Sequence, residues 1–103
     1  MKNIVLSAAC GLETAYIELF IKSLRKYYKD EIFFLVKKKD FKIKKLLKEH
    51  DCEFLEINDH KFDIQIKRYN YYLKILEKNN FKKVLICDSR DIYFQSNPFD
   101  YPF

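Results

Sequence analysis

Hydrophobic residues in this chain form four short continuous runs, separated by stretches with a different spacing. Continuous apolar runs of this length are typical of strands that are buried on both faces of a parallel sheet. The third run is weaker and more alternating than the others. The pattern predicts strands at Lys2–Ala9, Glu31–Val36, Cys52–Ile57 and Phe81–Cys87.

In the stretches between these runs, the apolar residues are spaced as in amphipathic helices. After Thr14, a plausible N-cap, apolar side chains recur at i, i+3, i+4 and i+7. This first core face comprises Ile17, Phe20, Ile21, Leu24, Tyr27 and Tyr28. A second, shorter helix follows Asp40, with Phe41, Leu46 and Leu47 on its face, and ends near His50. A third is expected to be capped by Asp63, to end at Asn79-Asn80, and to carry Ile64, Tyr69, Tyr72, Leu73 and Leu76.

The order β-α-β-α-β-α-β predicts an α/β protein with a Rossmann-like parallel sheet and right-handed crossovers. The expected strand order is 3-2-1-4. Ligands of such sheets bind at the carboxyl ends of the strands, where the strand order reverses. The predicted crevice therefore lies between Ser7–Gly11 and Asp88–Asp91.

In this order the fourth strand is an edge strand, yet its run Val84–Cys87 contains no Lys or Pro to protect it. Exposed apolar edges are normally covered. We therefore expect residues 1–103 to be a single partial domain, the first half of a longer one, or to pair with a partner such as a second copy.

Composition narrows the class of protein. The chain has 103 residues, of which 49% are hydrophobic, and only one Gly, which excludes glycine-rich phosphate loops. Cys10, Cys52 and Cys87 have neither zinc-site nor disulfide-framework spacing. No apolar run approaches the roughly 18–20 residues of a membrane span. We expect a cytoplasmic protein without a transmembrane segment, with peripheral association to a membrane left open.

The net charge is +5, and seventeen of the twenty basic residues are Lys. Such a bias is typical of A/T-rich codon usage, which weakens the link between basicity and nucleic-acid binding. The lysines are spread over many elements and no nucleic-acid-binding motif is present. A basic nucleic-acid-binding domain is therefore the least favoured interpretation, and we expect no nucleic-acid partner.

The candidate chemistry lies at Asp88-Ser89-Arg90-Asp91, directly after a buried strand. Two carboxylates three residues apart in a tight turn can converge on one hard cation, Mg²⁺ or Mn²⁺. Arg90 could add a fork of donors to a phosphate. From spacing alone, a solvated turn in which an Asp caps the next segment is about as well supported.

The wider sequence from Val84 to Phe99 resembles a family of GT-A-type glycosyltransferases. Their signature is an apolar strand followed by D-x-R-D-hydrophobic-x-F-Q-x-x-P-F, here Asp88 to Phe99. Arg68-Tyr69…Tyr72-Leu73 is similar to the helix that precedes this motif in the family. Phe20…Ser23-Leu24-Arg25 is similar to its first helix, which often contains F-x-x-S-L-[RK]. The resemblance spans almost the whole chain and implies a nucleotide-diphosphosugar transferase fold.

The resemblance also implies roles for individual residues. Asp88 and Asp91 match the acidic motif that binds the metal and the donor diphosphate, with Arg90 beside them. The more common motif of such enzymes is D-x-D, so this DxD-like variant leaves metal dependence open. Ser7, Ala8 and Ala9 match the first-strand loop that receives the nucleotide. Arg68 is a candidate to contact the donor or to hold Asp88, and a surface ion pair is its alternative.

These observations favour the donor-binding half of a glycosyltransferase that uses a nucleotide-sugar donor and an unidentified glycan, lipid or protein acceptor. Any catalytic base is expected beyond Phe103, so residues 1–103 alone should have little or no transferase activity. The alternative is a nucleotide-binding α/β module, or a degenerate remnant, without transfer chemistry.

Overall fold

The four predicted strands form one parallel sheet. The computed structural model describes residues 2–9, 13–57, 61–78, 80–87 and 93–100, with only the backbone described for 61–66. The strands are β1 (Lys2–Ala8), β2 (Glu31–Lys37), β3 (Glu53–Ile57) and β4 (Phe81–Ile86). Their order is β3-β2-β1-β4, and all three neighbouring pairs are parallel. The predicted strand order is therefore confirmed.

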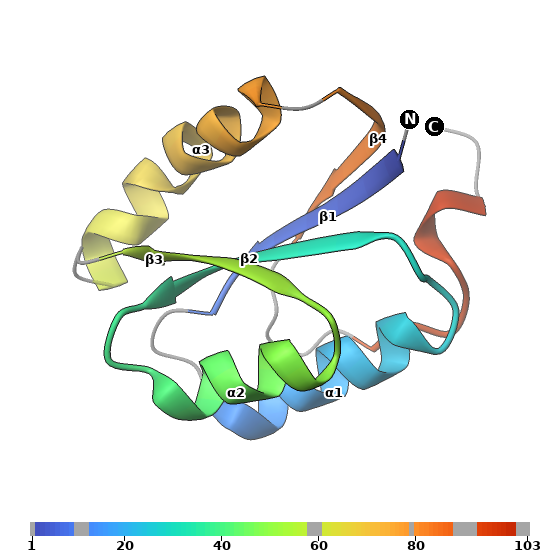
Figure 1. Ribbon diagram of the computed structural model, residues 1–103, viewed down its shortest axis with the longest axis horizontal. Coiled ribbons are helices and arrows are strands. Elements are labelled where there is room, and N and C mark those ends of the chain that lie inside the picture. Colours follow the sequence, from blue (N-terminus) through green and yellow to red (C-terminus); the bar gives the residue numbers. More distant parts are fainter. Residues whose placement is uncertain (1, 10–12, 58–60, 79, 88–92, 101–103) are drawn as a thin grey trace.

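Helices cover the sheet on both faces. Helices α1 (Thr14–Arg25) and α2 (Phe41–Glu49) lie against one face, and α3 (Lys61–Glu77) lies against the other (Figure 1). A short 3-10 helix, η1 (Pro98–Asp100), lies near the end of the chain. Within the ranges given above, no helix combines the length and the apolar character that crossing a membrane requires.

The alternation of side chains along each strand divides the core into two clusters. Val5 of β1 and Phe34 of β2 pack with α1 and α2, whereas Ile4 and Leu6 pack with α3. All three consecutive residues Ile4, Val5 and Leu6 are almost fully buried. The continuous apolar run thus reflects burial on both faces, which is the physical basis for predicting a parallel sheet.

The helix starts differ in detail from the sequence prediction. Helix α1 begins at Thr14 and its N-cap is Glu13, so Thr14 is a helical residue rather than the cap. Asp40 takes the N-cap position of α2 as expected, although its side chain makes no capping hydrogen bond with the described residues. Helix α3 begins at Lys61, two residues before Asp63, so Asp63 is not its N-cap.

All three predicted helix faces are partly wrong. Helix α1 ends at Arg25, and Tyr27, which follows it, is exposed rather than part of the core face. Phe41 is 73% exposed, and Ile43 fills the core position of α2 instead. The two residues lie about 200° apart around the helix, so they cannot both face the sheet. Of the α3 side chains from Lys67 onward, Tyr72 and Ile75 are buried, whereas Tyr69 and Leu73 are exposed. The side chain of Ile64 lies outside the described residues.

Strand β4 is an edge strand whose two faces differ. In register with Ile4 and Leu6, Val84 and Ile86 point to the α3 side of the sheet, and each is 42% exposed. Leu85 points to the opposite side and packs against the α1–α2 core. The expected exposed apolar edge is therefore present, on the α3 face of β4.

Candidate functional site

The carboxyl ends of β1 and β4 are tied together by Ser7. Its side chain is fully buried, and its Oγ donates a 2.7 Å hydrogen bond to the backbone oxygen of Cys87. The Cys87 N–H donates in turn to the Leu6 oxygen at 3.1 Å. Because Asp88 follows Cys87 directly, the chain enters the acidic motif beside the end of β1.

The small residues that follow Ser7 have different environments. The N–H of Ala9 donates to the Leu35 oxygen at 2.8 Å, and its methyl group is fully buried in the α1–α2 core. Ala8 is half-buried against the α3 side. A ligand at this strand end could therefore approach the backbone near Ala8, whereas the side chains of Ser7 and Ala9 serve the fold.

The acidic motif itself, with Asp88, Arg90 and Asp91, lies outside the described residues. The proposed ligation of a divalent cation by Asp88 and Asp91 thus stays a prediction. Within the described part of the chain, no group of three or more His, Cys, Asp or Glu side chains could hold a metal ion. The chemistry of the predicted donor set, two carboxylates, fits a hard cation.

The segment that follows the motif is anchored on α1. The Phe94 N–H donates a 3.0 Å hydrogen bond to Ser23 Oγ, and Ser23 Oγ donates to the Phe20 oxygen at 3.1 Å. The Phe94 ring packs edge-on against Phe20 with centroids 5.2 Å apart, and Phe20 packs similarly on Phe34 at 5.6 Å. Six residues, 88–93, therefore separate Cys87, which is bonded to β1, from Phe94, which is fixed on α1.

A second aromatic contact holds the same segment further along. Phe99 is buried, and its ring lies 5.2 Å from that of Tyr28. The Phe99 N–H donates to Asn97 Oδ1 at 2.9 Å, which shapes the turn before η1. The α1 residues and the C-terminal residues that resemble family motifs are thus in direct contact, 71 positions apart in the case of Ser23 and Phe94.

Sequence reasoning missed the role of Ser23. The available signal was a single hydroxyl on an otherwise apolar helix face, between Phe20 and Leu24. A buried hydroxyl needs hydrogen-bond partners. The Phe20 oxygen of the same helix accepts its proton, and its own oxygen stays available to accept from a segment that passes over α1. Which segment this would be could not be deduced from the helix alone.

Arg68 lies in the first half of α3 and is half-buried. Its Nη2 donates to Tyr69 Oη at 3.3 Å, and its guanidinium carbon lies 5.1 Å from the centroid of the Tyr69 ring. The structure therefore places Arg68 against its neighbouring tyrosine. Its proposed contact with Asp88 or with a donor stays a prediction, because Asp88 lies outside the described residues.

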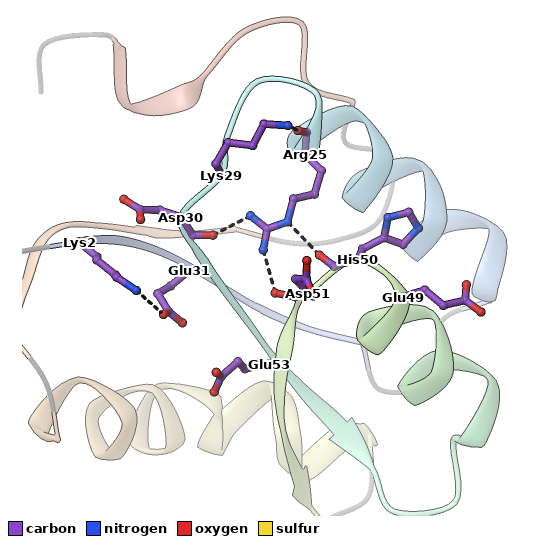
Figure 2. A pocket seen from close by; sticks show the side chains of 9 residues that line it. All are labelled: Lys2, Arg25, Lys29, Asp30, Glu31, Glu49, His50, Asp51 and Glu53. Carbon is purple, nitrogen blue, oxygen red and sulfur yellow. Dashed lines mark hydrogen bonds and ion pairs between the residues drawn. The ribbon is translucent and has the colours of Figure 1, made fainter.

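The opposite, amino-terminal edge of the sheet holds an open pocket of about 390 Å³ (Figure 2). Five carboxylates line it, against three basic side chains and His50. They are those of Asp30, Glu31, Glu49, Asp51 and Glu53, with Lys2, Arg25 and Lys29 as the bases. Lys2 pairs with Glu31 at 3.5 Å. The remaining excess of negative charge disfavours a diphosphate here.

Arg25 forms one wall of this pocket and connects separate parts of the fold. Its guanidinium donates to the backbone oxygens of His50 (3.0 Å), Asp30 (2.6 Å) and Asp51 (2.9 Å). A further bond reaches the Tyr28 oxygen at 3.3 Å. Figure 2 shows the side chain inserted among these loops. Because its donors are satisfied by backbone carbonyls, Arg25 serves the structure rather than a ligand.

The Cys52 thiol, next to this pocket, is buried, and burial raises its pKa from the ordinary 9.0 to about 11. The positive charge of Arg25 opposes part of this increase. Burial likewise raises the pKa of Tyr28, whose hydroxyl donates to the Glu31 oxygen at 2.8 Å. Both groups are therefore neutral in the folded protein at neutral pH.

Two results should follow for Cys52. At pH 8, iodoacetamide should alkylate it about 100-fold more slowly in the folded protein than in urea, because the thiolate is the reacting form. Peptide mass spectrometry measures this ratio. Since the folded-state pKa is raised, the contribution of the neutral Cys52 thiol to the free energy of unfolding is complete below about pH 9. This contribution is lost as the pH rises towards 11. Equal alkylation rates in folded and unfolded protein would contradict this environment.

In comparisons with known proteins, no family model, no curated protein and no solved structure matches this chain.

Proposed function

We propose that the carboxyl edge of β1 and β4 binds a nucleotide-diphosphosugar, as the donor-binding part of a GT-A-like glycosyltransferase. One observation carries the proposal: the hydrogen bond from Ser7 Oγ to the Cys87 oxygen, at 2.7 Å, brings the end of β1 next to the start of Asp88–Asp91. This is the edge at which ligands of open parallel sheets bind. The resemblance of Asp88–Phe99 to the family signature supplies the substrate class.

The proposed chemistry is electrostatic. Asp88 and Asp91 would hold a divalent cation, which would supply positive charge to the diphosphate and so make it a better leaving group. Arg90 donates to the same oxygens. An acceptor hydroxyl forms the new bond to the anomeric carbon as the bond from that carbon to the diphosphate breaks. The hydroxyl proton passes to a base that lies outside the residues assigned here.

The anchoring of residues 93–100 supports this proposal on physical grounds. A cluster of two carboxylates and a guanidinium binds a diphosphate well only if its backbone is held in place before the ligand arrives. Ser7 fixes the chain at Cys87, and Ser23 with Phe20 fixes it at Phe94. The described residues on either side of the motif, Cys87 and Phe94, are thus held by the sheet and by α1.

The test is a thermal melt with a nucleoside diphosphate and Mn²⁺. At a hundredfold excess over Kd, binding should stabilise the protein by about 2.7 kcal/mol, which corresponds to an increase in Tm of about 10–20 °C. In Asp91→Ala this increase should disappear. Glu49→Ala, which removes an exposed carboxylate at the opposite edge, is the matched control and should retain it.

Three outcomes would count against the proposal. A shift that survives in Asp91→Ala would favour a nucleotide-binding module without metal-assisted transfer. A shift lost only in Glu49→Ala would move the site to the acidic pocket. An unchanged Tm at millimolar ligand would exclude donor binding by this chain.

A further inference from the structure

The positive charge of the molecule is concentrated in one segment. Residues 37–48 contain seven Lys and one Asp, a net charge of +6, whereas the whole chain carries +5. The other 91 residues hold thirteen basic and fourteen acidic side chains, and so carry −1. Although lysines occur in many elements, the net charge therefore belongs to the end of β2 and to α2.

The fold exposes this charge on one face of α2. Ile43, Leu46 and Leu47 are buried against the core. The outward face carries Phe41, Lys45 and Lys48, at positions i, i+4 and i+7, with Lys42 beside them; all four side chains are exposed. Lys38 and Lys39, also exposed, extend the basic surface to the carboxyl end of β2. We call these six residues the α2 basic face.

Phe41 distinguishes this surface from an ordinary solvated helix. Its ring is 73% exposed, and Lys44 Nζ lies 4.7 Å from the ring centroid. A hollow of about 540 Å³ adjoins it, lined by Glu13, Thr14, Lys39, Asp40, Phe41, Lys42 and Ile43. An exposed apolar ring among lysines combines the two contributions that hold proteins on anionic bilayers, apolar burial in the interface and electrostatic attraction to lipid headgroups.

We propose that the α2 basic face docks on the surface of a bilayer that contains anionic lipids, with Phe41 entering the interface. The lysine ammonium groups pair with lipid phosphates, and the Phe41 ring moves from water into contact with acyl chains. The end of α2 that carries Phe41 and Lys42 points toward the bilayer. The other end, with Glu49 and Asp51, is repelled by the bilayer, so the charges favour one orientation.

A lipid surface fits this face better than a nucleic acid does. The six residues include no Arg, the residue that reads phosphates and base edges in bidentate fashion. The surface is the outer side of a helix, whereas single-stranded nucleic acids follow basic grooves that carry several stacking rings. Phe41 is the only aromatic residue of this face.

The test is co-sedimentation with vesicles. The protein should bind vesicles of equimolar phosphatidylcholine and phosphatidylglycerol, should not bind phosphatidylcholine alone, and should dissociate as salt increases. The triple variant Lys42→Gln, Lys45→Gln, Lys48→Gln should lose about 100-fold in affinity. Phe41→Ser should lose about tenfold and keep its salt dependence.

The matched control is Lys74→Gln, Lys78→Gln, Lys82→Gln, which removes the same charge from exposed positions of α3 and its surroundings. It should bind like the wild type. Circular dichroism melts verify that all variants stay folded. The proposal would be overturned if the two triple variants lost the same affinity, or if the protein bound both vesicle types equally. It would also be overturned if the protein bound a single-stranded DNA oligonucleotide more tightly than vesicles and Phe41→Ser did not weaken that binding.

Discussion

Replacing Arg25 with Met should lower the free energy of unfolding by about 3 kcal/mol. The guanidinium donates to four backbone oxygens, those of Tyr28, Asp30, His50 and Asp51. These belong to the turns after α1 and after α2, so a single side chain joins two crossover connections. Met keeps much of the packing of the stem but leaves carbonyls at this partly buried junction without their donor.

Arg25→Lys distinguishes the contribution of the positive charge to stability from that of the planar guanidinium. A lysine ammonium retains the positive charge but cannot present the planar fork that reaches several carbonyls at once. We expect it to recover less than half of the loss. Lys26→Met, a change at the exposed neighbouring residue, should alter stability by no more than about 0.5 kcal/mol. Urea unfolding measures all three, and a fully stable Arg25→Met would show that the carbonyls do not depend on this side chain.

Replacing Phe94 with Ala should destabilise the protein by about 2–3 kcal/mol, somewhat less than a fully buried Phe would, because the ring is only partly buried. The variant removes the edge-on contact with Phe20 and exposes the core around Phe34. In a domain of this size the loss corresponds to a decrease in Tm of about 10–20 °C. Tyr93→Ala is the matched control, because the neighbouring ring is 58% exposed, and its Tm should change little.

Phe94→Ala should also weaken donor binding, if the acidic motif depends on its anchor. At a temperature where the variant is still folded, the affinity for a nucleoside diphosphate with Mn²⁺ should decrease more in Phe94→Ala than in Tyr93→Ala. Isothermal calorimetry measures both. Equal affinity in the two variants would mean that residues 88–92 hold their conformation without the contact to α1.

Much of the fold followed from the sequence, because burial on both faces leaves a direct mark on a strand. Ile4-Val5-Leu6 is apolar throughout since one residue faces α1 and its neighbours face α3. The strand order then followed from general rules of parallel sheets. Helix faces were harder to predict, because an apolar residue on a helix need not be buried. Phe41 and Leu73 are exposed, whereas Ile43 and Ile75 fill the core.

The roles of two connecting side chains, Ser23 beside the segment that follows the acidic motif and Arg25 at the opposite edge of the sheet, could not be predicted for a different reason. The roles of Ser23 and Arg25 are set by backbone atoms of distant segments, Phe94 in one case and His50 and Asp51 in the other. Hydrophobic periodicity carries no information about such contacts. In the structure, Phe20, Ser23 and Arg25 each make a specific tertiary contact that the helix sequence alone does not reveal.

The most direct test of the central claim is to locate a bound cation. Mn²⁺ broadens NMR signals of nuclei near it, so a titration of ¹⁵N-labelled protein with Mn²⁺ and a nucleoside diphosphate maps the site. The proposal predicts that broadening begins at Asp88–Asp91 and at Ser7–Ala9, the carboxyl edge of the sheet. Broadening that begins at Glu31, Asp51 and Glu53 would place the cation in the opposite pocket and would contradict the proposed function.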